Sequence, residues 1–222
     1  MITRPLLLVS KSVRALLPYW HEPLGQLFTP RMLGDLDITE ACRIQWAADN
    51  DCFAGFDEGR YLNMLQALTY RPGCLFITCP DVVADARATL RRFDQWRPAL
   101  QYVWATVNED DVDADQPIHQ PIAFVAQDGQ ERLPVPWEHF QALFVDGSTQ
   151  WKLGPHAAAL IREANHRGKW VHVGRVNTLQ RIRWFKALGV DSIDGSGFAR
   201  FTRARLPMGT AALRAPTQGT LL

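Results

Sequence analysis

Short apolar runs recur along the chain and predict buried strands. Eight of them stand out, over residues 2–9, 25–28, 44–48, 74–79, 122–126, 142–145, 170–173 and 190–193. Short continuous apolar runs are typical of strands that are buried on both faces of a parallel sheet. Segments with helical periodicity lie between several of the runs, over 57–68, 83–96, 153–166 and 178–188. Gly168 and Gly189 follow the last two of these segments, where a glycine commonly terminates a helix.

The alternation of strands and helices predicts the fold class. Short buried strands separated by helices form βα units with parallel strands. Eight candidate strands favour a compact (β/α)8 TIM-like barrel, and an open doubly wound sheet is the alternative. We predict one barrel domain over residues 1–208 and a C-terminal tail over 209–222. Residues 102–107 are β-prone and lead into the acidic run NEDDVDAD, which we interpret as part of an insertion at about 107–120.

Composition places the chain among ordinary globular proteins. Its 222 residues suit one domain, although a barrel of this kind typically has about 250. The hydrophobic fraction is 47%, and no apolar run approaches the roughly 20 residues that cross a bilayer. The cysteines lack CxxC spacing, so we expect neither a zinc site nor a disulfide framework, and no cofactor. A reducing, cytoplasmic location is the simplest expectation, with no membrane partner.

The charge of the chain gives little guidance about partners. The net charge is +1, whereas a nucleic-acid-binding domain usually has an overall basic footprint. Basic residues are nevertheless concentrated in the C-terminal segment that follows Gly168. That segment is either a surface that binds a nucleic-acid backbone or an ordinary solvated surface. Protein partners and a homodimer remain open.

Polar residues follow the predicted strands from the third onward. They are Asp49-Asn50-Asp51, Asp81, Gln127-Asp128-Gly129, Asp146-Gly147, His172 with Arg175 and Asn177, and Asp194-Gly195-Ser196. The carboxyl ends of barrel strands converge on one mouth, so these residues predict an acidic pocket there. Any single group is also explained as a turn or helix cap, although Gln127 and His172 are not preferred turn residues.

Paired carboxylates at a barrel mouth suit glycosidic chemistry. One carboxylate attacks the anomeric carbon and the other transfers a proton, through a covalent intermediate. From the residues alone Asp49, Asp81, Asp146 and Asp194 are all eligible for these two roles.

Four segments resemble the motifs of tRNA-guanine transglycosylases in their order. Residues 48–53 (ADNDCF) are similar to TDSGGF/Y, and 124–129 (FVAQDG) to GIVQGG. Residues 171–176 (VHVGRV) are similar to YLMGVG, and 189–194 (GVDSID) to GVDMFD. The resemblance extends over about residues 43–200. The phrases PDVVADARATL, FVAQDGQERLPVPW, DGSTQWKLG and GKWVHVGRVN further resemble compact phage and bacterial relatives of DNA deazaguanine transglycosylases. Those enzymes exchange guanine in DNA for a 7-deazaguanine.

The resemblance implies roles for the acidic and amide residues. Asp194 would be the nucleophile that attacks C1′, and Asp49 would be the general acid and base. Asp81 would accept hydrogen bonds from N1 and N2 of guanine. Gln127 and the amide of Gly147 would contact O6. Chemistry on a base of this kind requires that the base be turned out of its stack.

The resemblance also implies the remaining contacts of the substrate. Phe53 and Val173 would lie above and below the base, and Gly174 would belong to the same base-binding site. The expected phosphate contacts are Arg175, Arg200 and Arg203. The implied partners are DNA and a free 7-deazaguanine base.

The chain departs from the family pattern in two ways. The CxCxxC…H zinc motif of the tRNA enzymes has no counterpart after Asp194, since Cys42, Cys52, Cys74 and Cys79 all precede it. We therefore expect a barrel without the zinc-binding subdomain, which favours DNA over tRNA as the substrate. Asp51 and Asp146 also replace glycines of the family motifs. Extra carboxylates near Asp49 would raise its pKa by like-charge repulsion.

Simpler explanations exist for several of these residues. Asp194 is alternatively a helix cap. A separate alternative is that Asp191 is the acid, since alternation along a strand allows only one of Asp191 and Asp194 to face the barrel interior. His172 is expected to be a satisfied histidine of the barrel lining, Trp151 a packing residue and Lys152 a solvated side chain. The NEDDVDAD run is expected to be a solvated loop and not a cation site.

Three classes of function follow from this sequence. The first is exchange of guanine in DNA for a 7-deazaguanine base. The second is another enzyme on the same barrel, either a tRNA-guanine exchanger or a hydrolase that releases a base or cleaves a nucleoside. The third is a non-catalytic relative that binds a deazapurine or a nucleic acid.

Overall fold

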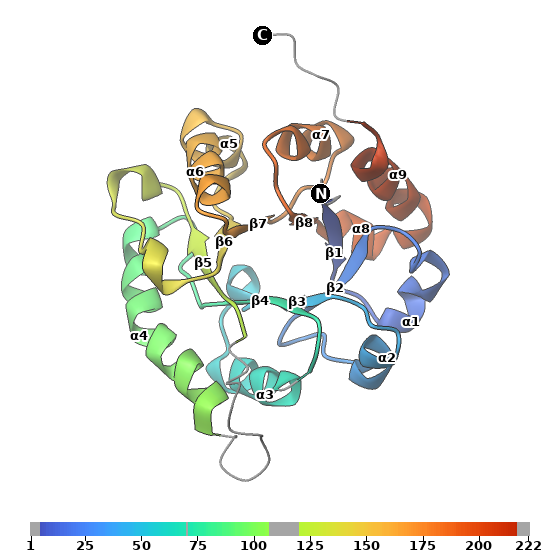
Figure 1. Cartoon of the computed structure of the whole chain (residues 1–222), viewed down its shortest axis with the longest axis horizontal. Helices are drawn as coiled ribbons and strands as arrows, with labels where there is room; N and C mark the ends of the chain where they lie inside the picture. The colour runs from blue at the N-terminus through green and yellow to red at the C-terminus, as the bar shows by residue number, and fades with distance from the viewer. Residues whose placement is uncertain (1–4, 70, 107–119, 217–222) are drawn as a thin grey trace.

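The computed structural model describes residues 5–69, 71–106 and 120–216 and shows a closed barrel of eight parallel strands (Figure 1). The strands are β1 (Leu6–Val9), β2 (Leu24–Phe28), β3 (Trp46–Ala48), β4 (Cys74–Thr78), β5 (Ile122–Ala126), β6 (Ala142–Val145), β7 (Trp170–Val173) and β8 (Ser192–Asp194). They follow one another around the barrel in chain order. Leu7 of β1 pairs with Leu24 of β2 on one side and with Ile193 of β8 on the other. This closure confirms the predicted (β/α)8 barrel and excludes the open sheet.

Helices surround the barrel (Figure 1). They are α1 (Val13–Leu16), α2 (Leu36–Ala41), α3 (Glu58–Leu68), α4 (Ala86–Thr106), α5 (Thr149–Lys152), α6 (Pro155–His166), α7 (Leu179–Ala187), α8 (Ser196–Arg200) and α9 (Thr202–Arg214). Side chains of Asp57 and Thr178 cap α3 and α7 by accepting backbone N–H groups. Gly168 and Gly189 have φ of 66° and 80°, as expected of glycines that terminate helices. No helix within the described ranges has the length and apolar character to cross a membrane.

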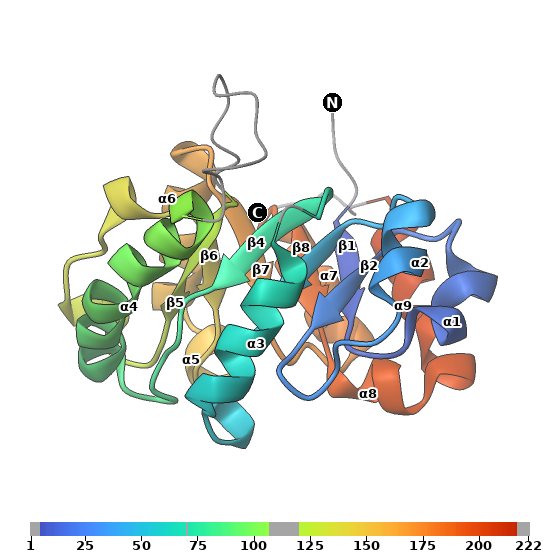
Figure 2. The same ribbon diagram turned by 90° about the horizontal axis from the view of Figure 1, so that it is seen from below.

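Alternation along the strands separates two hydrophobic layers. Leu8, Leu27, Val125 and Phe144 belong to a cluster inside the barrel. The larger cluster lies between the strands and the helices and includes Val173. Because successive side chains of a strand point to opposite faces, a residue's position in the strand decides whether it can reach the mouth. The short helices α5 and α8 directly follow β6 and β8 and lie at the mouth, below the strands in Figure 2.

Two boundaries differ from the sequence prediction. Helix α4 continues to Thr106, so most of the β-prone segment 102–107 is helical. The acidic run and nearly all of the predicted insertion lie outside the described residues. Helix α9 extends to Arg214 and buries Leu213, so the barrel domain does not end at residue 208.

Candidate active site

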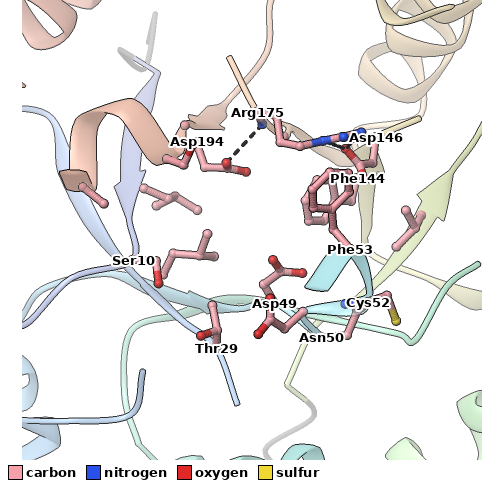
Figure 3. Close-up of a pocket in the computed structure, with 18 of the residues that line it drawn as sticks. Ser10, Thr29, Asp49, Asn50, Cys52, Phe53, Phe144, Asp146, Arg175 and Asp194 are labelled. Carbon is pink, nitrogen blue, oxygen red and sulfur yellow. Dashed lines mark hydrogen bonds and ion pairs between the residues drawn. The ribbon is translucent and has the colours of Figure 1, made fainter. Parts of the chain in front are cut away.

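A pocket of about 400 Å³ opens at the carboxyl ends of the strands. Among the described residues, five aspartates line it, and they are Asp49, Asp51, Asp81, Asp146 and Asp194. They lie at the carboxyl ends of β3, β4, β6 and β8, so the four carboxylates that the sequence left eligible do converge. Figure 3 shows Asp49 and Asp194 on different walls, with both carboxyl groups pointing into the pocket. The pocket thus brings a potential nucleophile and a potential proton donor together.

Asp194 is the last residue of β8, and both of its oxygens have hydrogen-bond partners. The backbone N–H of Arg175 donates to Oδ1 at 3.1 Å. Nε2 of His172 lies 3.0 Å from Oδ2. The carboxylate is therefore fixed at the pocket wall while it remains accessible from the pocket.

Asp49 follows β3 and has a different environment. Burial raises the pKa of its carboxyl well above the ordinary value, and the Asp194 carboxylate raises it further. Asp81, Asp146 and Asp51 add smaller contributions in the same direction, as expected for like charges. Two neighbouring carboxyl groups in contrasting environments are the usual basis for assigning an acid and a nucleophile. Asp49 is accordingly the better candidate for the proton donor.

Asp81 is held on the pocket wall by two amide side chains. Nδ2 of Asn50 donates to Oδ1 at 2.8 Å, and Nε2 of Gln127 donates to Oδ2 at 2.6 Å. Burial raises the pKa of Asp81, and these two hydrogen bonds oppose that shift. The oxygen of Gln127 accepts the N–H of Ala84 at 2.9 Å, and Gln127 does not line the pocket. Gln127 therefore positions Asp81, and its expected contact with O6 of guanine has no support in this geometry.

Two cations compensate the charge of Asp146. Its Oδ1 lies 2.9 Å from Nε of Arg175 and 3.5 Å from Nζ of Lys152. Lys152 is only 4% exposed and also donates to the carbonyl oxygen of Gly174. Burial lowers the pKa of Lys152, and Asp146 opposes this shift. The expectation of a solvated Lys152 is wrong, because the side chain is buried against Asp146 and the Gly174 carbonyl.

Phe53 lies at the rim of the pocket and is 66% exposed. The guanidinium of Arg175 lies over its ring, 4.6 Å from the centroid. Arg175 has a φ of 58°, and this left-handed conformation directs its N–H towards Asp194. Arg200 also lines the pocket, whereas Arg203 is exposed on α9 and does not.

Two of the predicted base contacts lie elsewhere. Val173 is fully buried in the layer between strands and helices, because it points away from its neighbour His172 on β7. Gly147 is packed against Asp128 and Trp151 and does not line the pocket. Gly174 does line it.

The apolar wall is provided instead by residues that sequence reasoning missed, among them Phe144 and Val125. The signal was present in the strand alternation: a strand that directs Asp146 to the mouth also directs Phe144 inward.

Two simpler explanations are also settled by the geometry. The carboxylate of Asp191 accepts the N–H of Val171 at the start of β7, away from the mouth, so Asp191 is not the acid of this pocket. Trp151 donates its indole N–H to Glu131 at 2.9 Å and does not line the pocket, as expected of a packing residue.

Comparison with known proteins supports the fold class alone. No family model matches the chain. No curated protein matches it either. Among solved structures, the chain is similar to the tryptophan synthase A-subunit of the hyperthermophile Pyrococcus furiosus, with a TM-score of 0.51 and 16% identity, over 94% of this chain and 93% of that one. That similarity is to another barrel and shows the TIM barrel fold alone.

Proposed function

We propose that this protein is a pentosyltransferase that exchanges guanine in DNA for a 7-deazaguanine base. A barrel fold hosts many unrelated reactions, so the proposal depends on the site and not on the fold. The main support for the proposal is that the carboxyl groups of Asp194 and Asp49 both point into the pocket at the barrel mouth. Of the two, only Asp194 is fixed by two hydrogen-bond partners. Two of the four motif resemblances, over residues 48–53 and 189–194, assign the same two residues to catalysis.

The proposed reaction is a double displacement at C1′ of the target nucleotide. An oxygen of Asp194 attacks C1′, the bond from C1′ to N9 of guanine breaks, and the Asp49 carboxyl gives its proton to the leaving base. The products of this step are a covalent aspartyl-glycosyl intermediate and free guanine. The incoming 7-deazaguanine then loses its N9 proton to Asp49, and N9 attacks C1′ and releases Asp194. Both carboxyl groups return to their starting states, and the configuration at C1′ is retained.

The pocket also offers contacts for the base. The Asp81 carboxylate has fixed orientation and suits the N1–H and N2–H donors of guanine. Phe144 and Val125 provide apolar surface for the ring faces, and Phe53 lies at the entrance. A target base reaches this enclosed site only when it is turned out of its stack.

DNA is the proposed polymer because phrases of the sequence such as PDVVADARATL resemble compact relatives of the DNA deazaguanine transglycosylases. Arg200 at the rim and the exposed Arg203 on α9 are the proposed phosphate contacts. Arg175 is a weaker candidate, since its guanidinium is already paired with Asp146.

The test is incorporation of radiolabelled guanine, and separately of labelled 7-deazaguanine, into guanine-containing DNA and bulk tRNA. We expect label in DNA and not in tRNA. Asp194→Ala should abolish incorporation, because the intermediate cannot form. Asp191→Asn, immediately before β8, is the matched control, and it should retain incorporation because its side chain lies away from the mouth.

Other outcomes identify the alternatives. Label in tRNA alone would indicate a tRNA exchanger, and release of base from free nucleoside would indicate a hydrolase. Binding of base without incorporation of either label would indicate a non-catalytic relative. Asp81→Asn should lose discrimination between guanine and other purines while exchange itself continues.

A further inference from the structure

We propose that His172 is a positioning residue for Asp194, held with its proton on Nε2 by a hydrogen-bond chain that begins at Trp170. The inference deepens the proposed function, since it takes Asp194 to be the nucleophile. It adds a residue that neither the strand-end pattern nor the family motifs assign to the reaction.

The chain of contacts lies inside the barrel on two adjacent strands. Nε1 of Trp170 donates to Oγ of Ser192 at 2.9 Å. Oγ of Ser192 lies 2.9 Å from Nδ1 of His172, and Nε2 of His172 lies 3.0 Å from Oδ2 of Asp194. His172 and Ser192 are fully buried and pair directly in the register of β7 and β8. Alternation places all four residues on the inner face.

For the neutral imidazole of His172, donor and acceptor counting assigns the tautomer. The Ser192 hydroxyl accepts from the Trp170 indole, and its single proton is then available for Nδ1 of His172. A neutral imidazole that accepts at Nδ1 carries its proton on Nε2 and donates it to the Asp194 carboxylate. The other neutral tautomer would direct an unprotonated Nε2 at a carboxylate oxygen, which gives no hydrogen bond.

Aromatic rings fix the plane of the imidazole. The Phe144 ring is perpendicular to it, with centroids 4.5 Å apart, and the Phe76 ring lies 5.1 Å away. These contacts leave the imidazole no space to rotate, because the barrel interior is closely packed. His172 therefore controls the orientation of Oδ2 while the Arg175 N–H controls Oδ1.

Rate measurements on variants test the role in catalysis. His172→Phe should slow formation of the covalent intermediate roughly 10-fold to 100-fold, the value of a hydrogen bond to a charged group, with little change in KM. His172→Gln keeps an N–H donor and should recover most of the rate. His166→Gln changes an exposed histidine of α6 and is the matched control. Equal rates for His172→Phe and the wild type would overturn the inference, whereas an inactive wild type would overturn the proposed function with it.

A spectroscopic measurement tests the tautomer without reference to activity. In protein labelled with nitrogen-15 at histidine, we expect the His172 signals of a protonated Nε2 and an unprotonated Nδ1. Ser192→Ala should shift the Nδ1 signal and leave the other histidines unchanged. A proton on Nδ1 in the wild type would overturn the inference even if DNA exchange is observed.

Discussion

Asp49 shares its pocket with four other aspartates, and each of them makes its ionised form less stable. Burial is the largest contribution, because water no longer solvates the charge. Such a cluster of carboxylates lowers the stability of the folded state, as is common at active sites. Under the proposed function, this cluster prepares Asp49 to give a proton. Its effect should be measurable as a pH-dependent loss of stability.

Replacing Asp49 by asparagine should stabilise the fold above neutral pH. The pKa of Asp49 in the folded state lies well above the value of about 3.9 for an unfolded chain. At pH values between these two pKa values, the folded state binds more protons than the unfolded state. The free energy of unfolding therefore falls as pH rises. Asp49→Asn removes this loss, and we expect a gain of about 1 kcal/mol, or roughly 2–4 °C in Tm, at pH 8.

The same comparison at low pH provides the control. At about pH 3 and below, Asp49 is mostly protonated in the unfolded as well as the folded state, and the Tm of Asp49→Asn should approach that of the wild type. Asp94→Asn, at an exposed position on α4, should match the wild type at both pH values. A difference in Tm for Asp49→Asn that does not change with pH would contradict the explanation.

At the residue scale, the sequence predicted the acidic pocket but not all of its contacts. Asp49, Asp81 and Asp194 were accessible to prediction because carboxyl ends of barrel strands share one mouth. Val173 was misplaced because a motif match ignores which face of the strand a side chain occupies. The burial of Lys152 depends on Asp146 and the Gly174 carbonyl, which only the tertiary structure brings together.

The element that connects β7 to α7 couples the two walls of the pocket. Its residue Arg175 adopts a left-handed conformation that is unfavourable for residues other than glycine. In this conformation, the N–H of Arg175 contacts Asp194 and its guanidinium contacts Asp146. The strain is thus located at the turn that orients the proposed nucleophile, as is common at functional sites.

Two substitutions of Arg175 separate the effect of the turn conformation on stability from the effect of the ion pair with Asp146. Arg175→Gly and Arg175→Ala both remove the contact with Asp146, but only glycine adopts the positive φ without strain. We expect the glycine variant to be more stable by about 1 kcal/mol in urea unfolding and to retain more exchange activity. Equal stability of the two variants would show that the turn is not strained.

Prediction of elements succeeded where apolar runs were short and continuous. The strands β5, β6 and β7 have the predicted bounds. The end of α4 was missed because its last residues, among them Tyr102 and Val103, also have high strand propensity. Helix α9 was not predicted, and its residues Gly209 and Thr210 are poor helix formers, whereas the structure buries both of them.

At the scale of the whole molecule, α9 belongs to the layer of helices that surrounds the barrel. It packs against α7 and β1, and Leu206 and Leu213 are fully buried. Nζ of Lys186 on α7 donates to carbonyl oxygens at the end of α9, including those of Leu213 and Ala215. Basic side chains are stabilising at helix C-termini, so the contact fixes the last turn of α9 against the barrel.

Two alanine substitutions within α9 should therefore differ strongly in their effect on the free energy of unfolding. Leu213→Ala removes a fully buried side chain and should cost about 2–5 kcal/mol of unfolding free energy. Met208→Ala changes a residue that is 55% exposed on the same helix and should lie within about 0.5 kcal/mol of the wild type. Denaturant unfolding measures both values, and a small loss for Leu213→Ala would support the predicted tail.

Closure of the barrel by β1 and β8 has a consequence for synthesis on the ribosome. Until Ser192–Asp194 has been translated, a growing chain has unpaired edges at β1 and β7, and exposed edges promote aggregation. The same late strand contributes Asp194. Under the proposed function, a translation product that ends before Asp194 has no nucleophile, so it cannot form a covalent adduct with the genome.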